Sequence, residues 1–345
     1  MRQCGVMNTP ELTAETLEAI GGVEGRGRYS LAEAADLTGL DALDVAEVWA
    51  AMGRAVSAPD EVLVSDLDLR LMRNVGELSR FVDGDSGSVP AGLLRTLRTA
   101  AHSLRRVSEA HVTALAEALG PEPVGSDALI EVAARSGAPM RDVLMDLWTG
   151  AVTESVAAVV SESVDPGNPS FAVGFVDLSG FTARSQQLET VELAELVERF
   201  DRVTGEVLAG RGATLVKTIG DEAMFVHRDP AAAAWTALEL VERCGADELL
   251  VSARGGVSWG RPLRLGGDYY GPSVNLASRL VQLAVPGAVL IDDALAAELA
   301  GEAGLELVPM RPQRLRGCGR RRIHVARRIT VQAQGASMGS GARSR

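Results

Sequence analysis

The spacing of apolar residues changes at one point in this chain, and the change limits what the chain can fold into. Before the Pro-Gly-Asn-Pro breaker at 166–169, apolar residues recur at helical intervals. Such faces run through 64–82 and 90–119, and a last helix is expected over 138–163. After the breaker, short β-branched runs alternate with helical patterns. The sequence therefore predicts an all-α part followed by an α+β part.

The length of the chain allows two cores of ordinary size. It has 345 residues, of which 46% are hydrophobic. We expect a helical domain over 1–137, a linking helix and linker over 138–170, and an α+β domain over 171–331. The tail 332–345 is small and polar, and we expect it to be disordered.

The second half has a predicted order of strands and helices. Two strands joined by Gly220 and Asp221 are expected to form a hairpin-like pair. The expected strands are 171–177, 213–219, 222–227, 248–258 and 289–293, and the expected helices are 190–209, 230–243 and 272–284.

Composition argues against several classes of protein. No run of about 18 apolar residues occurs, and the N-terminus carries acids where a signal peptide needs apolar residues, so we expect no membrane span and a cytoplasmic location. Cys4, Cys244 and Cys318 lack metal-ligand or disulfide spacing, which predicts reduced thiols. Residues 1–165 hold 13 basic and 26 acidic side chains. That acidic half argues against nucleic acid as a partner.

One segment of the first half has the pattern of a helix-turn-helix. It covers residues 29–49, with Gly39 at the turn. Its second helix carries Asp41, Asp44 and Glu47 and no basic residue, which argues against reading of a DNA groove. We interpret it as a structural or sensory module.

Two carboxylates fall at predicted strand ends. Asp177 ends an apolar strand, and Asp221 lies at the turn of the next strand pair. Such carboxylates suit a divalent metal with phosphate. The alternative is that Asp177 caps a helix and Asp221 fills a turn. The chain after Asp177 opens a helix whose exposed amides suit phosphate charge, at Ser179, Gly180, Phe181 and Thr182.

A polar pair and a single lysine stand out further along. Asn275 and Arg279 lie four residues apart, so one helix face presents both, either to orient a ribose and clamp a phosphoryl group or as an exposed face without a task. Lys217 is the one lysine among 34 basic residues. Its ammonium is a compact single donor, and the planar guanidinium of arginine cannot replace it where one donor must point at one acceptor. The alternative is that this one lysine is retained by chance. Asp268, in a glycine-rich approach, is by itself an ordinary turn residue.

Three segments together resemble the catalytic domain of class III adenylate and guanylate cyclases. They are FVDLSGFTARS at 175–185, KTIGDEAMF at 217–225 and GGDYYGPSVNLASRL at 266–280. The resemblance covers roughly 168–330, about half of the chain. It implies a ferredoxin-like α+β fold and the conversion of ATP to cyclic AMP and pyrophosphate.

The resemblance also implies roles for individual residues. Asp177 and Asp221 match the ligands of two Mg²⁺ (or Mn²⁺) ions, and Lys217 and Asp268 match the pair that selects adenine. Lysine only donates and an aspartate only accepts, which complements the acceptor N1 and donor N6 of adenine. A neighbouring pair matches the residues that fix the ribose and stabilise the transition state, Asn275 and Arg279. In the family the metal residues come from one subunit, and the base-selecting and transition-state residues come from the other, so a homodimer is expected.

The helical half resembles the regulatory domain that precedes some cyclases, with an unknown small-molecule or physical regulator. It contains only His102 and His111, so a histidine switch in the linker has no residue to use.

Two other functions are weighed against a cyclase. GDEAMF at 220–225 faintly resembles the turn of diguanylate cyclases, a rival enzyme. The other rival is a module that binds ATP without turnover.

Overall fold

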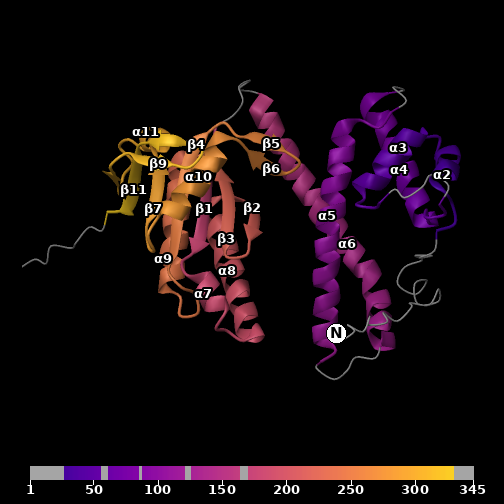
Figure 1. Ribbon diagram of the computed structural model, residues 1–345, viewed down its shortest axis with the longest axis horizontal. Helices are drawn as coiled ribbons and strands as arrows, with labels where there is room; N and C mark the ends of the chain where they lie inside the picture. Colours follow the sequence, from indigo (N-terminus) through magenta and orange to yellow (C-terminus); the bar gives the residue numbers. More distant parts are fainter. Residues whose placement is uncertain (1–26, 56–60, 85–87, 121–125, 164–169, 330–345) are drawn as a thin grey trace, which may run out of the picture. The chain divides into compact units, whose positions relative to one another are not determined.

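A computed structural model shows two compact units, Met1–Asp165 and Pro166–Arg345, which are described separately. The breaker at 166–169 and the tail at 332–345 lie outside the described residues, so the expected boundaries and the expected disorder stay predictions. The described residues are 27–55, 61–84, 88–120, 126–163 and 170–329 (Figure 1).

The first unit is helical, as predicted. Ser30 forms a capping box at the start of the first described helix, and Gly39 ends that helix with φ 74° at the predicted turn. Trp49 and Met72 lie in the core of this unit. The described helices are α2 (Leu31–Thr38), α3 (Ala42–Ala51), α4 (Asp66–Asp83), α5 (Ala91–Ala118) and α6 (Ser126–Ser163).

Helix α6 is longer than the sequence pattern indicates. The helix expected from residue 138 begins at Ser126 and runs through Pro139. Proline removes one helical hydrogen bond, but the turns on either side keep theirs. Helix α5 packs beside α6, where His111 Nε2 lies 3.0 Å from Ser136 Oγ. Tertiary packing therefore supports helical turns that a local reading of proline would end.

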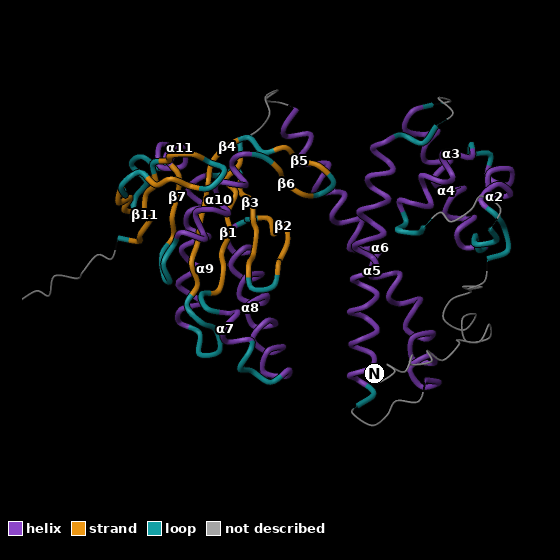
Figure 2. The backbone as a smooth tube through the Cα atoms, viewed as in Figure 1, coloured by secondary structure: helices purple, strands orange, loops and turns teal. Residues whose placement is uncertain are grey.

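A seven-stranded sheet forms the second unit, in the order β2-β3-β1-β4-β7-β11-β8 (Figure 2). All neighbours pair antiparallel except β4 and β7. The first four strands follow the βαββαβ order of a ferredoxin-like fold, which confirms the predicted α+β class. The strands are β1 (Phe171–Leu178), β2 (Thr214–Ile219), β3 (Glu222–His227), β4 (Ala253–Gly260), β7 (Val289–Asp292), β8 (Leu305–Pro309) and β11 (Ile323–Arg328).

Two short hairpins accompany the sheet and were not predicted. The first pairs β5 (Leu263–Leu265) with β6 (Asp268–Tyr270), and the second pairs β9 (Gln313–Leu315) with β10 (Gly319–Arg321). Each strand has only three residues, too few for a periodic pattern to stand out. Strand β4 also begins five residues later than the predicted 248, because Asp247 accepts from the amides of Leu249 and Leu250 in a turn.

Helices cover both faces of the sheet. Alternate residues of β1 point to opposite faces: Val176 faces the core beneath α8 and α9, while Val173 faces α10. A Cβ at Gly256 would lie 2.3 Å from the amide nitrogen of Val281, so α10 rests directly on β4. The helices are α7 (Phe181–Ser185), α8 (Thr190–Arg211), α9 (Pro230–Ala246), α10 (Pro272–Leu283) and α11 (Asp293–Glu298).

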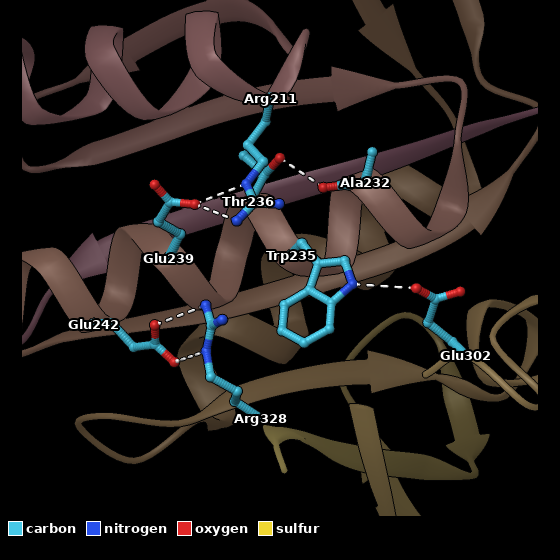
Figure 3. A network of polar contacts seen from close by, with 8 residues as sticks. All are labelled: Arg211, Ala232, Trp235, Thr236, Glu239, Glu242, Glu302 and Arg328. Atoms are coloured by element: carbon cyan, nitrogen blue, oxygen red, sulfur yellow. Dashed lines mark hydrogen bonds and ion pairs between the residues drawn. The ribbon is translucent and has the colours of Figure 1, made fainter. Parts of the chain in front are cut away.

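A polar network holds α9 against the end of β11 (Figure 3). Arg328 on β11 pairs with Glu242 on α9 at 3.1 Å, and its guanidinium lies 4.8 Å from the Trp235 ring centroid. The indole of Trp235 donates to Glu302 at 3.3 Å. These contacts hold α9 against β11, the strand next to the edge strand β8. In the described part of the chain, none of the helices combines the length and hydrophobicity that a bilayer crossing requires.

Candidate active site

The end of β1 brings an aspartate and an arginine into contact. The strand register sets Asp177 opposite Glu222 on β3 and Arg254 on β4. The Nε and Nη2 atoms of Arg254 donate to Oδ2 of Asp177 at 2.8 and 2.6 Å. Only 15% of the Asp177 side chain is exposed, so its charge depends on a nearby partner.

Two further carboxylates lie beside Asp177. Asp221 is in the turn between β2 and β3, where its carbonyl accepts from the amide of Leu178 at 3.1 Å. Burial and the Asp177 carboxylate raise the pKa of Asp221. Burial, together with Asp177 and Asp221, raises the pKa of Glu222 to about 7. Three carboxylates thus share one arginine, which leaves excess negative charge at this end of the sheet.

The donor set fits a divalent metal ion. Asp177 and Asp221 offer carboxylate oxygens, the ligands that hard divalent cations prefer. Among the described residues, no group of three or more Asp, Glu, His or Cys side chains could hold a metal by itself. Mg²⁺ commonly keeps one or two protein carboxylates and takes its remaining ligands from phosphates and water. A bound cation would also relieve the repulsion that raises the pKa of Asp221.

The turn after β1 contains the four residues predicted to face phosphate. Gly180 has φ 80°, a conformation that favours glycine, and precedes the short helix α7. The amide of Ser179 donates to the Ser252 carbonyl at 2.7 Å, whereas its buried hydroxyl has no hydrogen-bond partner within the described structure. Phe181 packs against the core and Thr182 is exposed. The Ser179 hydroxyl is therefore a polar group without a hydrogen-bond partner, two residues after Asp177 in the chain.

Lys217 and Asp268 meet across two different strands. The ammonium of Lys217 on β2 forms an ion pair with Oδ2 of Asp268 on β6, although 51 positions separate them in sequence. The other oxygen, Oδ1, accepts from the amide of Tyr269 at 2.8 Å. About a third of the Lys217 side chain and a quarter of the Asp268 side chain are exposed, 37% and 25%. The pair thus lies at a surface that a ligand can reach.

Asn275 and Arg279 lie on α10, apart from the carboxylates. Asn275 is exposed, and Arg279 is half-buried with Nη1 donating to Gln282 at 2.7 Å. Within the described residues, neither side chain has a hydrogen bond or ion pair with Asp177 or Lys217. The structure therefore forms two clusters, the carboxylates with Arg254 and the Lys217 pair, and it joins neither Asn275 nor Arg279 to them by a hydrogen bond or ion pair among the described residues.

The sequence reading missed two residues at this site. Arg254 is the one charged residue of β4, which pairs with β1, and Glu222 directly follows Asp221. A charged side chain inside an otherwise apolar or small-residue strand is the signal that could have identified Arg254. Its partner could not be named without the strand register.

Comparison with known proteins decides the family. A model of the adenylate and guanylate cyclase catalytic domain matches residues 166–327. An adenylate cyclase of Glutamicibacter nicotianae is 31% identical over 341 residues, covering 90% of this chain and 82% of that protein. The chain belongs to the adenylate and guanylate cyclase family. The predicted resemblance is thereby confirmed, and the family membership favours a nucleotidyl cyclase over a diguanylate cyclase.

Further matches to this cyclase cover different shares of the chain. An uncharacterized protein of Mycobacterium tuberculosis is 35% identical over 272 residues, 76% of this chain and 70% of that protein. The guanylate cyclase domain of RhGC from Catenaria anguillulae, solved in complex with GTP, aligns at 21% identity with a TM-score of 0.42. That alignment covers 47% of this chain and 98% of that domain.

Proposed function

We propose that the protein is an adenylate cyclase that converts ATP to 3′,5′-cyclic AMP and pyrophosphate. The contact between Lys217 and Asp268 is the observation that carries the choice of substrate. An ammonium can donate to adenine N1, and a carboxylate can accept from the N6 amino group. Guanine reverses that edge and would leave both groups unsatisfied, at about 1–3 kcal/mol each.

Asp177 and Asp221 are proposed to hold two Mg²⁺ or Mn²⁺ ions. When bound, these ions would neutralise the triphosphate and favour ionisation of the ribose 3′-hydroxyl. Arg254 now compensates the charge of Asp177, and a cation at that carboxylate would release its guanidinium. The freed Arg254 would lie beside the turn of Ser179 and could bind a phosphate in two-pronged fashion. Arg254 is thus proposed as a second group for the triphosphate, with residues 179–182.

Asn275 and Arg279 are proposed to complete the site of a second copy of the chain. Asn275 would fix the ribose, and Arg279 would stabilise the negative charge that develops at the α-phosphate. Support for a covered surface comes from exposed apolar side chains on either side of the Lys217 pair. These are Leu215 and Ile219 on β2, with 44% and 57% exposure, and Leu263, Leu265 and Tyr270 on the β5–β6 hairpin, with 59%, 42% and 49%. A homodimer would bury them and form two sites.

The first unit is proposed as a regulatory domain. We keep the predicted division into a helical domain over 1–137, a linking segment over 138–170 and a catalytic domain over 171–331. A small-molecule or physical signal would act on the helical domain and change the activity of the catalytic one. The proposed location is the cytoplasm, where ATP is available.

Product analysis tests the proposed function. Full-length protein with ATP and either Mg²⁺ or Mn²⁺ should release cyclic AMP and pyrophosphate in equal amounts. With GTP, a much lower rate of cyclic GMP formation is expected. Binding of ATP without product would support the sensor function instead, and a cyclic dinucleotide from GTP would support the diguanylate cyclase. A 166–345 fragment assayed beside the full chain would give the sign of regulation.

A further inference from the structure

An uninterrupted run of positive charge lies on the second small hairpin. Six arginines and no acidic residue occur within residues 310–322. All six side chains belong to exposed residues. We call this segment, β9 and β10 with their flanking residues, the arginine hairpin. Its arginines are Arg311, Arg314, Arg316, Arg320, Arg321 and Arg322.

These arginines lack the partners that other arginines of the same unit have. Arg199, Arg211, Arg243, Arg254 and Arg328 each pair with a carboxylate. Within the described residues, no arginine of the hairpin forms an ion pair or donates a hydrogen bond from its side chain. The whole chain has a net charge of −12, so acids to pair with are not scarce. A shortage of acidic residues in the chain therefore does not explain why the arginines of the hairpin lack ion-pair partners.

The strand register places two of the charges directly opposite each other. Arg314 on β9 pairs with Arg320 on β10, so the two side chains share one face of the hairpin. Leu315, next along β9, points to the other face and is buried with Ile323. The outer face therefore presents two adjacent guanidinium groups. Like charges in this position destabilise a hairpin, and a bound anion would remove the repulsion.

A recess beside the hairpin adds two more positive groups, Arg321 and Arg322. A cleft of about 560 Å³ is lined by Arg320, Arg321 and Arg322 together with the start of α11. Two aspartates also line the cleft, Asp292 and Asp293. Asp292 is already engaged, since it accepts from Ser258 Oγ at 2.8 Å and from the amide of Leu295 at 3.0 Å. Within the described residues, Asp293 forms no ion pair with the arginines of the cleft. The guanidinium groups therefore remain available to phosphate oxygens, which suit their forked geometry.

We propose that the arginine hairpin docks the protein on the anionic headgroups of a phospholipid membrane. Strands of three residues are only about 10 Å long, so the charges are concentrated in a small area. Lipid headgroups are small and move separately, so each can meet one guanidinium at such a spacing. A nucleic acid requires a longer basic face to follow its backbone, and the chain outside the hairpin is acidic. The outer face of the hairpin thus fits a lipid surface better than a long polyanion.

Vesicle sedimentation of the full-length protein tests this proposal. The protein should bind vesicles that contain phosphatidylglycerol and not vesicles of phosphatidylcholine alone, and added salt should weaken binding. The variant R314Q/R320Q should bind on the order of 25-fold more weakly, about fivefold per arginine. A matched control, R106Q/R202Q, removes two exposed arginines outside the hairpin and should bind like the unaltered protein. R314K/R320K keeps the charge and should retain most binding.

Several outcomes would overturn the proposal. Equal vesicle binding by R314Q/R320Q and the control would remove the hairpin from any membrane contact. Hairpin-dependent binding to duplex DNA without vesicle binding would assign the surface to nucleic acid. Complete displacement from vesicles by pyrophosphate, at an ionic strength matched with sodium chloride, would indicate a site for small free phosphates. A thermal unfolding temperature no lower than that of the unaltered protein, with unchanged cyclase activity without vesicles, would show that the variants are folded.

Discussion

At the residue scale, the two contacts of the site have different chemistry. The Asp177 carboxylate is largely buried, and the guanidinium of Arg254 compensates its charge. Lys217 and Asp268 form a partly exposed pair in which the ammonium donates hydrogen bonds and the carboxylate accepts them. A cation that takes Oδ2 of Asp177 must displace Arg254, which donates both of its hydrogen bonds to that oxygen. A base must likewise open the contact between Lys217 and Asp268. Each contact therefore fills a ligand position with a protein group.

Replacement of Asp177 by asparagine should lower kcat by on the order of 100- to 1000-fold, because a neutral amide is a poor ligand for a divalent ion. Glu298→Gln, an exposed change on α11, is the matched control and should leave kcat unchanged. Steady-state rates over a range of Mg²⁺ and Mn²⁺ concentrations measure both. Near-normal activity of the Asp177 variant at saturating metal would refute the metal assignment.

Base selection makes a separate prediction. The double variant K217E/D268C should lose about 10- to 100-fold of its preference for ATP over GTP, since each buried mismatch costs about 1–3 kcal/mol. The ratio of kcat/KM for the two nucleotides is the measurement. A ratio equal to that of the unaltered protein would show that Lys217 and Asp268 do not contact the base.

At the scale of elements, α10 is placed by the strand beneath it. A methyl group at Gly256 would lie 2.3 Å from the Val281 amide, which is backbone and cannot turn aside. The helix that carries Asn275 and Arg279 therefore depends on the absence of a side chain on β4. Packing of one element on another thus sets the position of residues with a proposed catalytic role.

Gly256→Ala should destabilise the protein by about 1–3 kcal/mol and also reduce kcat, because α10 must move away from the sheet. Gly205→Ala is the control: Gly205 is in helix α8, and a Cβ there meets nothing within 4 Å. That control should be neutral or stabilising by up to about 1 kcal/mol. Urea unfolding and initial rates measure the two effects. Equal stability of the two variants would contradict the close packing.

At the scale of the whole molecule, the site is proposed to need two chains. The carboxylates and the α10 pair form no hydrogen bond or ion pair with each other among the described residues, and exposed apolar side chains occur on β2 and the β5–β6 hairpin, which carry the Lys217 pair. A shared site predicts complementation between defective subunits. It also predicts that activity per chain falls when the protein is diluted below its dimer dissociation constant.

Mixing Asp177→Ala with Arg279→Ala subunits should restore activity. Each variant alone should be inactive, but a heterodimer would contain one site with all its residues intact. Random mixing of equal amounts makes half of the dimers heterodimers, each with one intact site, so about a quarter of normal activity is expected. Activity as low as that of either variant alone would refute the shared site.

Local patterns in the sequence determined much of the fold. Helical periodicity predicted the all-α half, β-branched runs predicted the strands around Asp177 and Asp221, and Gly39 marked a turn that the structure has. The family resemblance was also visible in the sequence, because its motifs are continuous stretches of chain, and the match to the cyclase catalytic domain confirmed it. The roles of the individual site residues stay predictions.

Tertiary structure alone decided which residues meet. Lys217 reaches Asp268 because β2 and the β5–β6 hairpin converge, and Arg254 reaches Asp177 through the β1–β4 register. The six arginines are visible in the sequence, but only strand pairing sets Arg314 against Arg320 on an exposed face. Periodicity reports the face that one segment buries, whereas contacts between distant segments depend on how strands pair across the chain.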